Sequence, residues 1–314
     1  MKDRLFIVVP LYNEEEVLRE TAKRLKEKIL SLIEADKISK DSKILFVNDG
    51  SKDSSWEMIK DLSIEDKVFK GICLSRNYGH QKALLAGLTI AKEYAEVIIS
   101  IDADLQDDIN AMDKMLDKYA EGFDIVYGVR SSRKKDSFLK RNTAFVFYKF
   151  MNLMGAEVVY NHGDFRLMSK RAVEELSKFE EVNLFLRGLV PMIGFKSTNI
   201  EYTRAERFAG GSKYPFTKML AFAMDGITSL SIKPIIFIAR LGLLIFFISL
   251  VALIYTIIKN FSGGTIVGWS SLMASIWLLG GLQLFAIGII GEYIGKIYTE
   301  TKHRPRYIIS QKLL

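Results

Sequence analysis

Two long apolar runs near the C-terminus constrain the fold of this chain more than any other feature. Residues 235–258 are apolar apart from Arg240 and a few hydroxyl side chains, and residues 269–290 form a second run. As helices rising 1.5 Å per residue they would be about 36 Å and about 33 Å long, enough to cross the hydrocarbon core of a bilayer. The connection, 259–268, carries a single lysine as its only charge. The pattern predicts a transmembrane hairpin over 234–295.

Basic residues on both sides of the hairpin predict its orientation. Because cytoplasmic flanks of membrane helices are enriched in lysine and arginine, both ends of the hairpin are expected in the cytoplasm. The opening segment has a short apolar run followed at once by acidic residues, which is not the pattern of a signal peptide. We therefore expect a multi-pass protein of the cell membrane, with its N-terminal domain and both termini cytoplasmic. The flanking residues are Lys213, Lys218, Lys233 and Arg240 before the hairpin and Lys296, Lys302, Arg304, Arg306 and Lys312 after it, the last group within a basic tail over 296–314.

The segment 213–233, directly before the hairpin, combines an apolar stripe with lysines at its ends. Its apolar side chains recur at helical spacing, so we interpret it as an amphipathic helix lying at the membrane surface. A helix packed into the protein core would show the same periodicity and stays open as the alternative. The stripe consists of Phe216, Met219, Leu220, Ala223, Ile227 and Leu230.

The composition agrees with a soluble domain attached to a membrane. Hydrophobic residues make up 49% of the 314 residues, which is high for a soluble enzyme, whereas 26% charged residues is too many for a pure membrane bundle. A single cysteine, Cys73, excludes an intramolecular disulfide and a cysteine-rich zinc site. The net charge of +7 suits anionic lipids or phosphorylated substrates. Nucleic acid is not expected as a partner, because the basic residues gather near the apolar runs without an interleaved aromatic platform.

The N-terminal region, 1–212, alternates strand-like and helix-like segments. Apolar runs at 5–10, 43–47 and 68–74 are each followed by a helical pattern, and a fourth run ends at Ile101. Three βα units in succession indicate an α/β domain with a mostly parallel sheet. The sequence has neither a dinucleotide-binding glycine motif nor a P-loop, which argues against nicotinamide-dependent redox chemistry and P-loop phosphoryl transfer.

The fourth run ends in two carboxylates, Asp102 and Asp104, separated by one residue. Alternate side chains of a strand point to the same face, and the carboxyl end of such a strand opens into the crevice where α/β sheets bind ligands. Carboxylate oxygens suit Mg²⁺ or Mn²⁺, cations that keep several waters and bridge substrate phosphates. An acidic loop that only caps the next helix would have the same sequence. The pattern alone leaves both a metal site and a helix cap open.

The motifs of the chain, taken in order, resemble those of family 2 glycosyltransferases. The resemblance is to the branch that acts on polyprenyl phosphates, which includes dolichol-phosphate mannose synthase and the bactoprenol glucosyltransferases of the GtrB type, and it covers essentially the whole chain. It implies a GT-A fold (α/β, Rossmann-like, with a mostly parallel sheet) and inverting transfer of a sugar from a nucleotide sugar to undecaprenyl or dolichyl phosphate. The motifs are Val9–Glu15, Asn48–Ser51, Leu74–Gly79, Asp102–Gln106, Gly163–Arg166 and Gly210–Tyr214, with the tail Gly291–Tyr298.

The resemblance also implies residue roles on the donor side. Asp102 and Asp104, supported by Gln106, would hold Mg²⁺ or Mn²⁺ against the diphosphate of the donor. Many relatives have two aspartates in the second motif; the first position here is Asn48, so only Asp49 is assigned to the nucleoside. The overall likeness to bactoprenol glucosyltransferases favours UDP-glucose over a GDP-sugar as the donor. The expected nucleoside-binding residues are Pro10, Tyr12, Glu14 and Asp49.

On the acceptor side, the polyprenyl phosphate is already an anion and needs a cationic cradle more than a strong base. Arginines offer forked donors that suit phosphate oxygens. Asp164 stands where the resemblance places a catalytic carboxylate, which would act as a base or orient the acceptor. Pairing of Asp164 with Arg166 is the structural alternative. The expected cradle is Arg130, Arg133, Arg207 and Lys213.

Two other functions share parts of this pattern. A processive polysaccharide synthase would have similar early motifs, but the expected Q-x-x-R-W motif is absent here, and Leu186–Gly188 does not replace it. A membrane-anchored sugar-nucleotide binder without activity would not need Asp102, Asp104 and Asp164, and their presence argues against it. Small residues such as Gly280 in the second apolar run offer faces on which homo-oligomers can pack.

Overall fold

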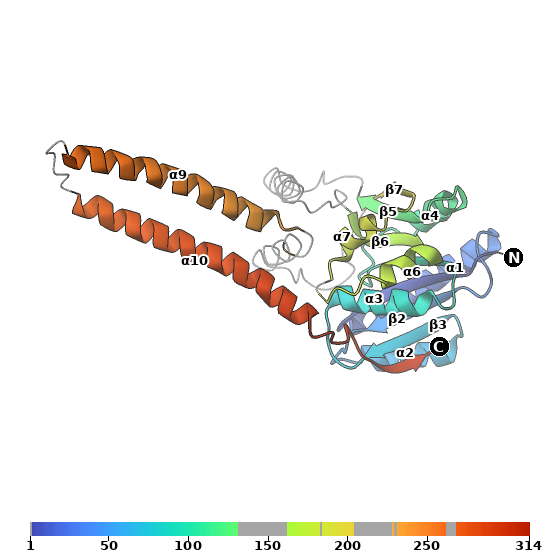
Figure 1. Ribbon diagram of the computed structural model, residues 1–314. Coiled ribbons are helices and arrows are strands. Elements are labelled where there is room, and N and C mark those ends of the chain that lie inside the picture. The colour runs from blue at the N-terminus through green and yellow to red at the C-terminus, as the bar shows by residue number, and fades with distance from the viewer. Residues whose placement is uncertain (1, 131–161, 183, 204–227, 229–230, 262–267) are drawn as a thin grey trace.

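The computed structural model describes residues 2–130, 162–182, 184–203, 228, 231–261 and 268–314 (Figure 1). Over these ranges the chain forms one sheet, helices on both of its faces and a long helical hairpin. The elements are β1 (Leu5–Leu11), α1 (Glu15–Glu34), β2 (Lys43–Asn48), α2 (Ser55–Glu65), β3 (Phe69–Leu74), α3 (His80–Ala91), β4 (Val97–Ser100), α4 (Ala111–Ala120), β5 (Ile125–Arg130), β6 (His162–Ser169), α6 (Lys170–Ser177), α7 (Leu186–Met192), β7 (Ser197–Tyr202), α9 (Lys233–Phe261), α10 (Trp269–Glu300) and β8 (Ile309–Leu313).

The described strands form one eight-stranded sheet in the order β7-β5-β6-β4-β1-β2-β3-β8. β1 pairs in parallel with β2 and β4, and β2 pairs in parallel with β3, which confirms the predicted succession of βα units. β6 runs antiparallel between β4 and β5, and β7 is parallel to β5. The sheet is therefore mixed but mostly parallel, as the sequence predicts.

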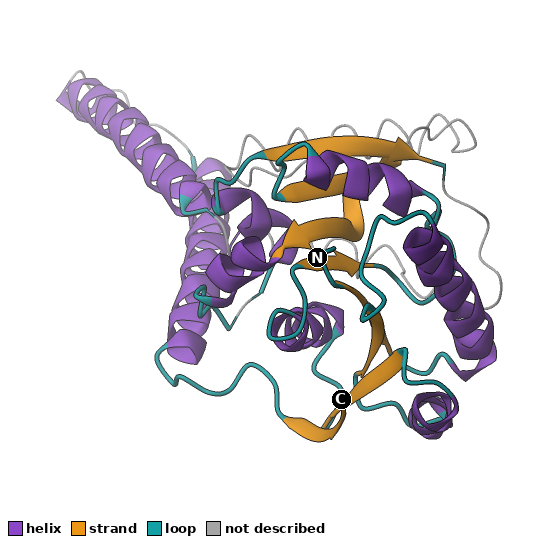
Figure 2. Ribbon diagram, turned by 90° about the vertical axis from the view of Figure 1, so that its right-hand side faces the viewer, coloured by secondary structure: helices purple, strands orange, loops and turns teal. Residues whose placement is uncertain are grey.

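The central strands are apolar throughout because helices cover the sheet on both sides (Figure 2). α1, α2 and α4 contribute to the core on one face, and α3, α6 and α7 to the core on the other. α3 lies unusually close to the sheet, since a Cβ added at Gly87 would fall 2.4 Å from Val8 Cγ1. This close packing fixes the N-terminal turn of α3 at the carboxyl ends of the strands.

α9 and α10 extend away from the α/β domain as a hairpin (Figure 1). With 29 and 32 residues, the helices are about 44 Å and about 48 Å long at 1.5 Å per residue. Both continue beyond the predicted runs, 235–258 and 269–290. Within the described chain, length and composition single out Leu278–Glu300 as a segment able to cross a membrane. The predicted amphipathic helix over 213–233 lies almost entirely outside the described residues.

The C-terminus differs from the basic tail predicted over 296–314. α10 continues to Glu300, and β8 then pairs antiparallel with β3 at the edge of the sheet. Trp56 Nε1 donates a hydrogen bond to Gln311 Oε1 at 2.9 Å. The tail returns to the α/β domain because the outer edge of β3 offers backbone groups that need hydrogen-bonding partners.

Candidate functional site

Three adjacent parallel strands bring the predicted donor residues to one edge of the sheet. β1 lies between β2 and β4 and is parallel to both. Tyr12 directly follows β1, Asp49 directly follows β2, and Asp102 follows β4 after one further residue. Because the carboxyl ends of parallel strands open on the same side, the three loops adjoin one another.

The loop after β4 is held against α1 in a fixed turn. Thr21 Oγ1 donates a hydrogen bond to the Ala103 carbonyl oxygen at 2.9 Å. Leu105 adopts a left-handed backbone conformation, with φ of 57°. The Gln106 backbone N–H then donates to Asp104 Oδ1 at 3.2 Å, and Asp104 is buried. The turn therefore holds Asp104 and Gln106 close to the end of β4, where Asp102 lies.

The carboxylates at this turn fit a divalent cation. Asp102 Oδ1 is buried and accepts no hydrogen bond from a described residue, and His80 Nε2 lies 3.5 Å away. Burial raises the pKa of Asp102, the charge of His80 offsets part of this effect, and a divalent cation would favour the ionised form further. Among the described residues, no group of three or more His, Cys, Asp or Glu side chains could hold a metal ion by itself. Asp102 and Asp104 would thus share Mg²⁺ or Mn²⁺ with phosphate oxygens and water.

Donors from three elements converge on Asp164, which is buried in β6 next to β4. Arg166 Nη2 donates to Asp164 Oδ1 at 2.8 Å. Arg187 Nη2, from α7, donates to Asp164 Oδ2 at 3.0 Å. From the first turn of α3, His80 Nε2 lies 3.2 Å from Oδ2, and Gln81 Nε2 donates to the same oxygen at 3.4 Å. The pairing with Arg166 that the sequence left open is therefore present, within a larger cluster.

The cations of this cluster keep Asp164 ionised. Burial by itself would raise the pKa of Asp164, but the charge of Arg187 and the hydrogen bond with His80 hold it well below its usual range. Burial lowers the pKa of His80, but the hydrogen bond to Asp164 and the charge of Asp102 outweigh that effect and raise it to about 9. The arrangement is an ion network in which the carboxylate is a poor proton acceptor. A base role for Asp164 remains a prediction.

Asp49 anchors the loop that follows β3. Its two carboxylate oxygens accept the backbone N–H groups of Tyr78 and Gly79 at 2.8 Å and 2.9 Å. The neighbouring Gly50 has φ of 65°, and a Cβ there would lie 2.4 Å from the carbonyl carbon of Arg76. The loops after β2 and β3 are therefore locked together. The predicted contact of Asp49 with the nucleoside would be additional to this structural role.

The remaining predicted nucleoside residues surround the end of β1. Pro10 is buried inside β1, Tyr12 is half-buried, and Glu14 is the N-cap residue of α1. Asn13, between them, has φ of 54°, and its Oδ1 accepts the backbone N–H of Lys52 at 2.8 Å. This bond ties the loop after β1 to the loop after β2. Their contacts with a nucleoside remain predictions.

Arg130 is the one predicted acceptor residue within the described part of the chain. It ends β5 beside Gly163, where an added Cβ would lie 3.4 Å from Arg130 Nη2. Arg130 also contacts the hydroxyl of Tyr202, which donates to Asp107 Oδ1 at 2.6 Å. Arg130 is thereby connected to the loop that carries Asp102 and Asp104. The other predicted residues, Arg133, Arg207 and Lys213, lie outside the described residues.

No sequence motif predicts a role for His80, Gln81 or Arg187. His80 and Gln81 begin α3 directly after the loop of the third βα unit, and a polar residue at that place in the fold was the available signal. Arg187 reaches Asp164 from 23 residues further along the chain. Its contribution depends on how α7 packs against β6, which no local pattern shows.

Comparisons with known proteins match both parts of the chain. Residues 6–177 match the family model of Glycosyl transferase family 2, and residues 233–297 match the GtrB C-terminal hairpin. The chain is 58% identical to the uncharacterized glycosyltransferase YkoT of Bacillus subtilis (strain 168), over 97% of this chain and 90% of that protein. It is 40% identical to the bactoprenol glucosyl transferase of Shigella phage SfV, over 98% of this chain and 99% of that protein. A solved structure of glucosyl-3-phosphoglycerate synthase from Mycobacterium tuberculosis, in complex with Mn²⁺, UDP-glucose and phosphoglyceric acid, aligns with 73% of this chain and 78% of its own at 15% identity, with a TM-score of 0.46.

Proposed function

Because the chain belongs to glycosyl transferase family 2, we propose that it transfers glucose from UDP-glucose to polyprenyl phosphate at a membrane surface. The observation that carries this proposal is the buried oxygen of Asp102, which accepts no hydrogen bond from a described residue and faces the ion network of Asp164. The match to a bactoprenol glucosyl transferase along nearly the whole chain supports the lipid acceptor.

On the donor side, the chemistry requires stabilisation of the leaving group. Cleavage of the bond between sugar and phosphate builds negative charge on the nucleoside diphosphate. A divalent cation bound by Asp102 and Asp104 would neutralise that charge. Gln106, held in the same turn, would support the diphosphate, while Tyr12 and Glu14 would contact the nucleoside.

On the acceptor side, the ion network favours an orienting role for Asp164. The acceptor phosphate is an anion and requires alignment with the anomeric carbon more than deprotonation. Arg166 is 1% exposed and cannot meet a substrate, whereas Arg187 is 27% exposed and can. Asp164 would therefore hold Arg187 and His80 in place as cations facing the acceptor phosphate. Arg130, together with Arg133, Arg207 and Lys213, would complete the cradle.

The hairpin associates the protein with a membrane, and we propose that both α9 and α10 cross it. β8 belongs to the same sheet as β1 to β4, which supports a topology in which the two ends of the hairpin would lie on one side of the membrane. An even number of crossings satisfies this requirement, and the basic flanks favour the cytoplasmic side. The active site would then face cytoplasmic UDP-glucose.

The test is a transfer assay with the purified full-length protein in proteoliposomes. A panel of radiolabelled nucleotide sugars is offered with undecaprenyl phosphate, with added Mn²⁺ or Mg²⁺ and with EDTA. We expect label in the lipid phase with UDP-glucose, loss of that label with EDTA, and loss in Asp102→Asn. A polymeric product would support the processive synthase, and nucleotide binding without transfer would support the inactive binder. If no nucleotide sugar labels the lipid, the proposed function is wrong.

A further inference from the structure

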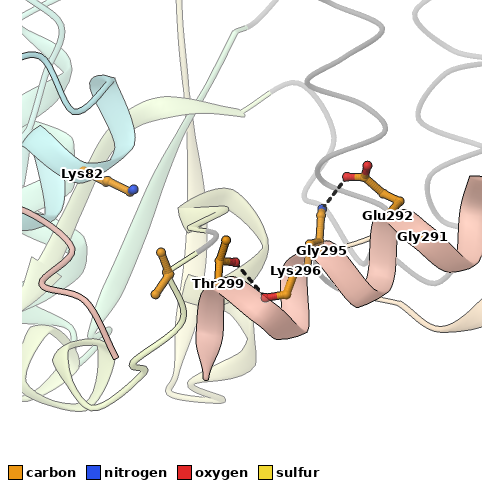
Figure 3. A pocket seen from close by; sticks show the side chains of 7 residues that line it. Lys82, Gly291, Glu292, Gly295, Lys296 and Thr299 are labelled. Carbon is orange, nitrogen blue, oxygen red and sulfur yellow. Dashed lines mark hydrogen bonds and ion pairs between the residues drawn. The ribbon is translucent and has the colours of Figure 1, made fainter. Parts of the chain in front are cut away.

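A cavity of about 410 Å³ lies between α3 and the last turns of α10 (Figure 3). Gly291 and Gly295 leave space on α10, because an added Cβ at either would meet no atom of the described chain within 4 Å. They are one helical turn apart, and Thr299 follows after another turn, so a single face of α10 lines the cavity. A cavity of this volume can hold the polar head of a ligand. Its remaining lining residues are Lys82, Val182, Glu292 and Lys296.

The charges around this cavity suit an anion. Figure 3 shows the side chain of Lys82 pointing from α3 towards α10. Lys296 is 16% exposed, donates to the hydroxyl of Thr228 and lies 4.0 Å from Glu292 Oε1. Glu292 is 54% exposed, so solvent screens its charge more than that of Lys296. Among the described lining residues, two ammonium groups and one screened carboxylate give a net positive charge, which a phosphate group complements.

The cavity lies where α10 is expected to leave the lipid. Glu292, Lys296 and Glu300 recur every four residues in the last part of this helix. Charged side chains are costly in the hydrocarbon core, so the core is expected to end before them, within the apolar segment Leu278–Glu300 and near the end of the predicted run 269–290. The Val182 backbone N–H donates to Glu300 Oε1 at 2.8 Å and holds one wall of the cavity against the helix. A lipid headgroup can therefore reach the cavity from the membrane surface.

The cavity is distinct from the reaction centre. Lys82 follows His80 by two residues on α3, and two residues of a helix turn the side chain by about 200°. His80 contacts Asp102 and Asp164, whereas Lys82 faces α10 on the opposite side of the helix. The residues that line the cavity are therefore not those that contact Asp102 and Asp164.

We propose that this cavity is a loading site, in which Lys82 and Lys296 bind the phosphate group of the polyprenyl phosphate before it moves to the reaction centre. The inference rests on the proposed function. The headgroup of an anionic phospholipid shares the phosphate chemistry, but a phosphate monoester carries more charge and so suits two ammonium groups better. Loading at the membrane surface lowers the concentration of long-chain acceptor needed for transfer without changing the reaction itself.

The experiment measures transfer kinetics for Lys82→Met and Lys296→Met in vesicles of neutral phospholipid and in vesicles with added anionic phospholipid. Each variant is assayed with undecaprenyl phosphate and with a short, water-soluble polyprenyl phosphate. Lys92→Met, at the other end of α3, and Lys302→Met, just beyond α10, are the matched controls. Thermal unfolding of each variant establishes that it is folded.

Each lysine variant is expected to raise the KM for undecaprenyl phosphate about tenfold, with kcat and the KM for the nucleotide sugar unchanged. The KM for the short acceptor and the kinetics of the control variants should not change. An unchanged KM for undecaprenyl phosphate overturns the loading site, and so does an effect confined to vesicles with anionic phospholipid. An equal loss of kcat with both acceptors would place the lysines in the reaction centre instead. Absence of transfer by the wild-type protein would reject the proposed function, which is a separate outcome.

Discussion

Asp164→Asn isolates the charge on which the ion network depends. Arg166 is 1% exposed and donates to Asp164 at 2.8 Å, whereas its contact from Nη1 to the Leu186 carbonyl oxygen is 3.5 Å long. Arg166 Nε has no hydrogen-bond partner among the described residues. Removing one partner of such a buried pair costs about 3–5 kcal/mol, because the other charge remains buried. For a protein of this size, that corresponds to a fall in Tm of about 6–20 °C.

The assay is thermal unfolding of the detergent-solubilised protein, followed by tryptophan fluorescence. Asp124→Asn is the matched control: Asp124 is also buried and pairs with an arginine, but Arg171 is 66% exposed, so this change leaves no cation buried and is expected to lower the Tm much less. Adding Arg166→Met to Asp164→Asn removes the stranded cation and should restore most of the Tm but not the transfer activity. A Tm for Asp164→Asn within about 2 °C of wild type, with no recovery in the double variant, would refute the buried-pair argument.

Contacts at the ends of the central strands lead to three more predictions. Asp102→Asn should lower transfer at least about 100-fold at any Mn²⁺ concentration, because the cation loses a charged ligand; calorimetry should show weaker Mn²⁺-dependent UDP binding. Gly50→Ala should destabilise the fold by about 1–3 kcal/mol in thermal unfolding, since φ is 65° and the added Cβ would strike the backbone of Arg76. The hydrogen bond from Arg4 lowers the pKa of Glu96 to about 2, so this pair stabilises the fold above the ordinary Glu96 pKa of 4.5 and loses its effect as the pH falls towards 2. Arg4→Gln should accordingly lower the Tm near neutral pH and leave it unchanged near pH 2. Because the pair is exposed, the loss in the free energy of unfolding near neutral pH should be less than about 1 kcal/mol.

The sequence predicts those parts of the fold whose signal is local. β1 to β4 are readable because helices bury both faces of the inner sheet, which requires continuous apolar runs. β8 is not readable, because Ile309–Leu313 is an edge strand whose three central residues are exposed. Its position depends on hydrogen bonds to the backbone of β3, and the backbone of almost any sequence can form such bonds. A segment rich in lysine and arginine near a membrane helix therefore predicts a tail rather than a strand.

The same distinction applies to the candidate site. Asp102 and Asp104 are predictable because one strand end and one turn place both carboxylates. Arg187 is not, since its contact with Asp164 arises only when α7 packs against β6. Asp49 shows a further limit: a carboxylate after a strand can bind a ligand or anchor a loop, and only the hydrogen bonds to Tyr78 and Gly79 reveal the second role.

If α10 crosses the membrane, the contacts that tie its C-terminal end to the α/β domain would set the height of the site above the lipid. Glu300 accepts the Val182 N–H, and Ile308, just before β8, accepts the N–H of Ser75, so the connection is fixed to the α/β domain. If the lipid ends near Ile290, the remaining helix raises the domain by about 15 Å at 1.5 Å per residue. An acceptor phosphate must cover that distance, which draws isoprenoid carbons from the lipid at about 0.8 kcal/mol for each exposed CH₂ equivalent. A phosphate-binding cavity between Lys82 and Lys296 divides this path into two shorter steps, and the cationic contacts in the first step offset part of the cost of exposing the chain.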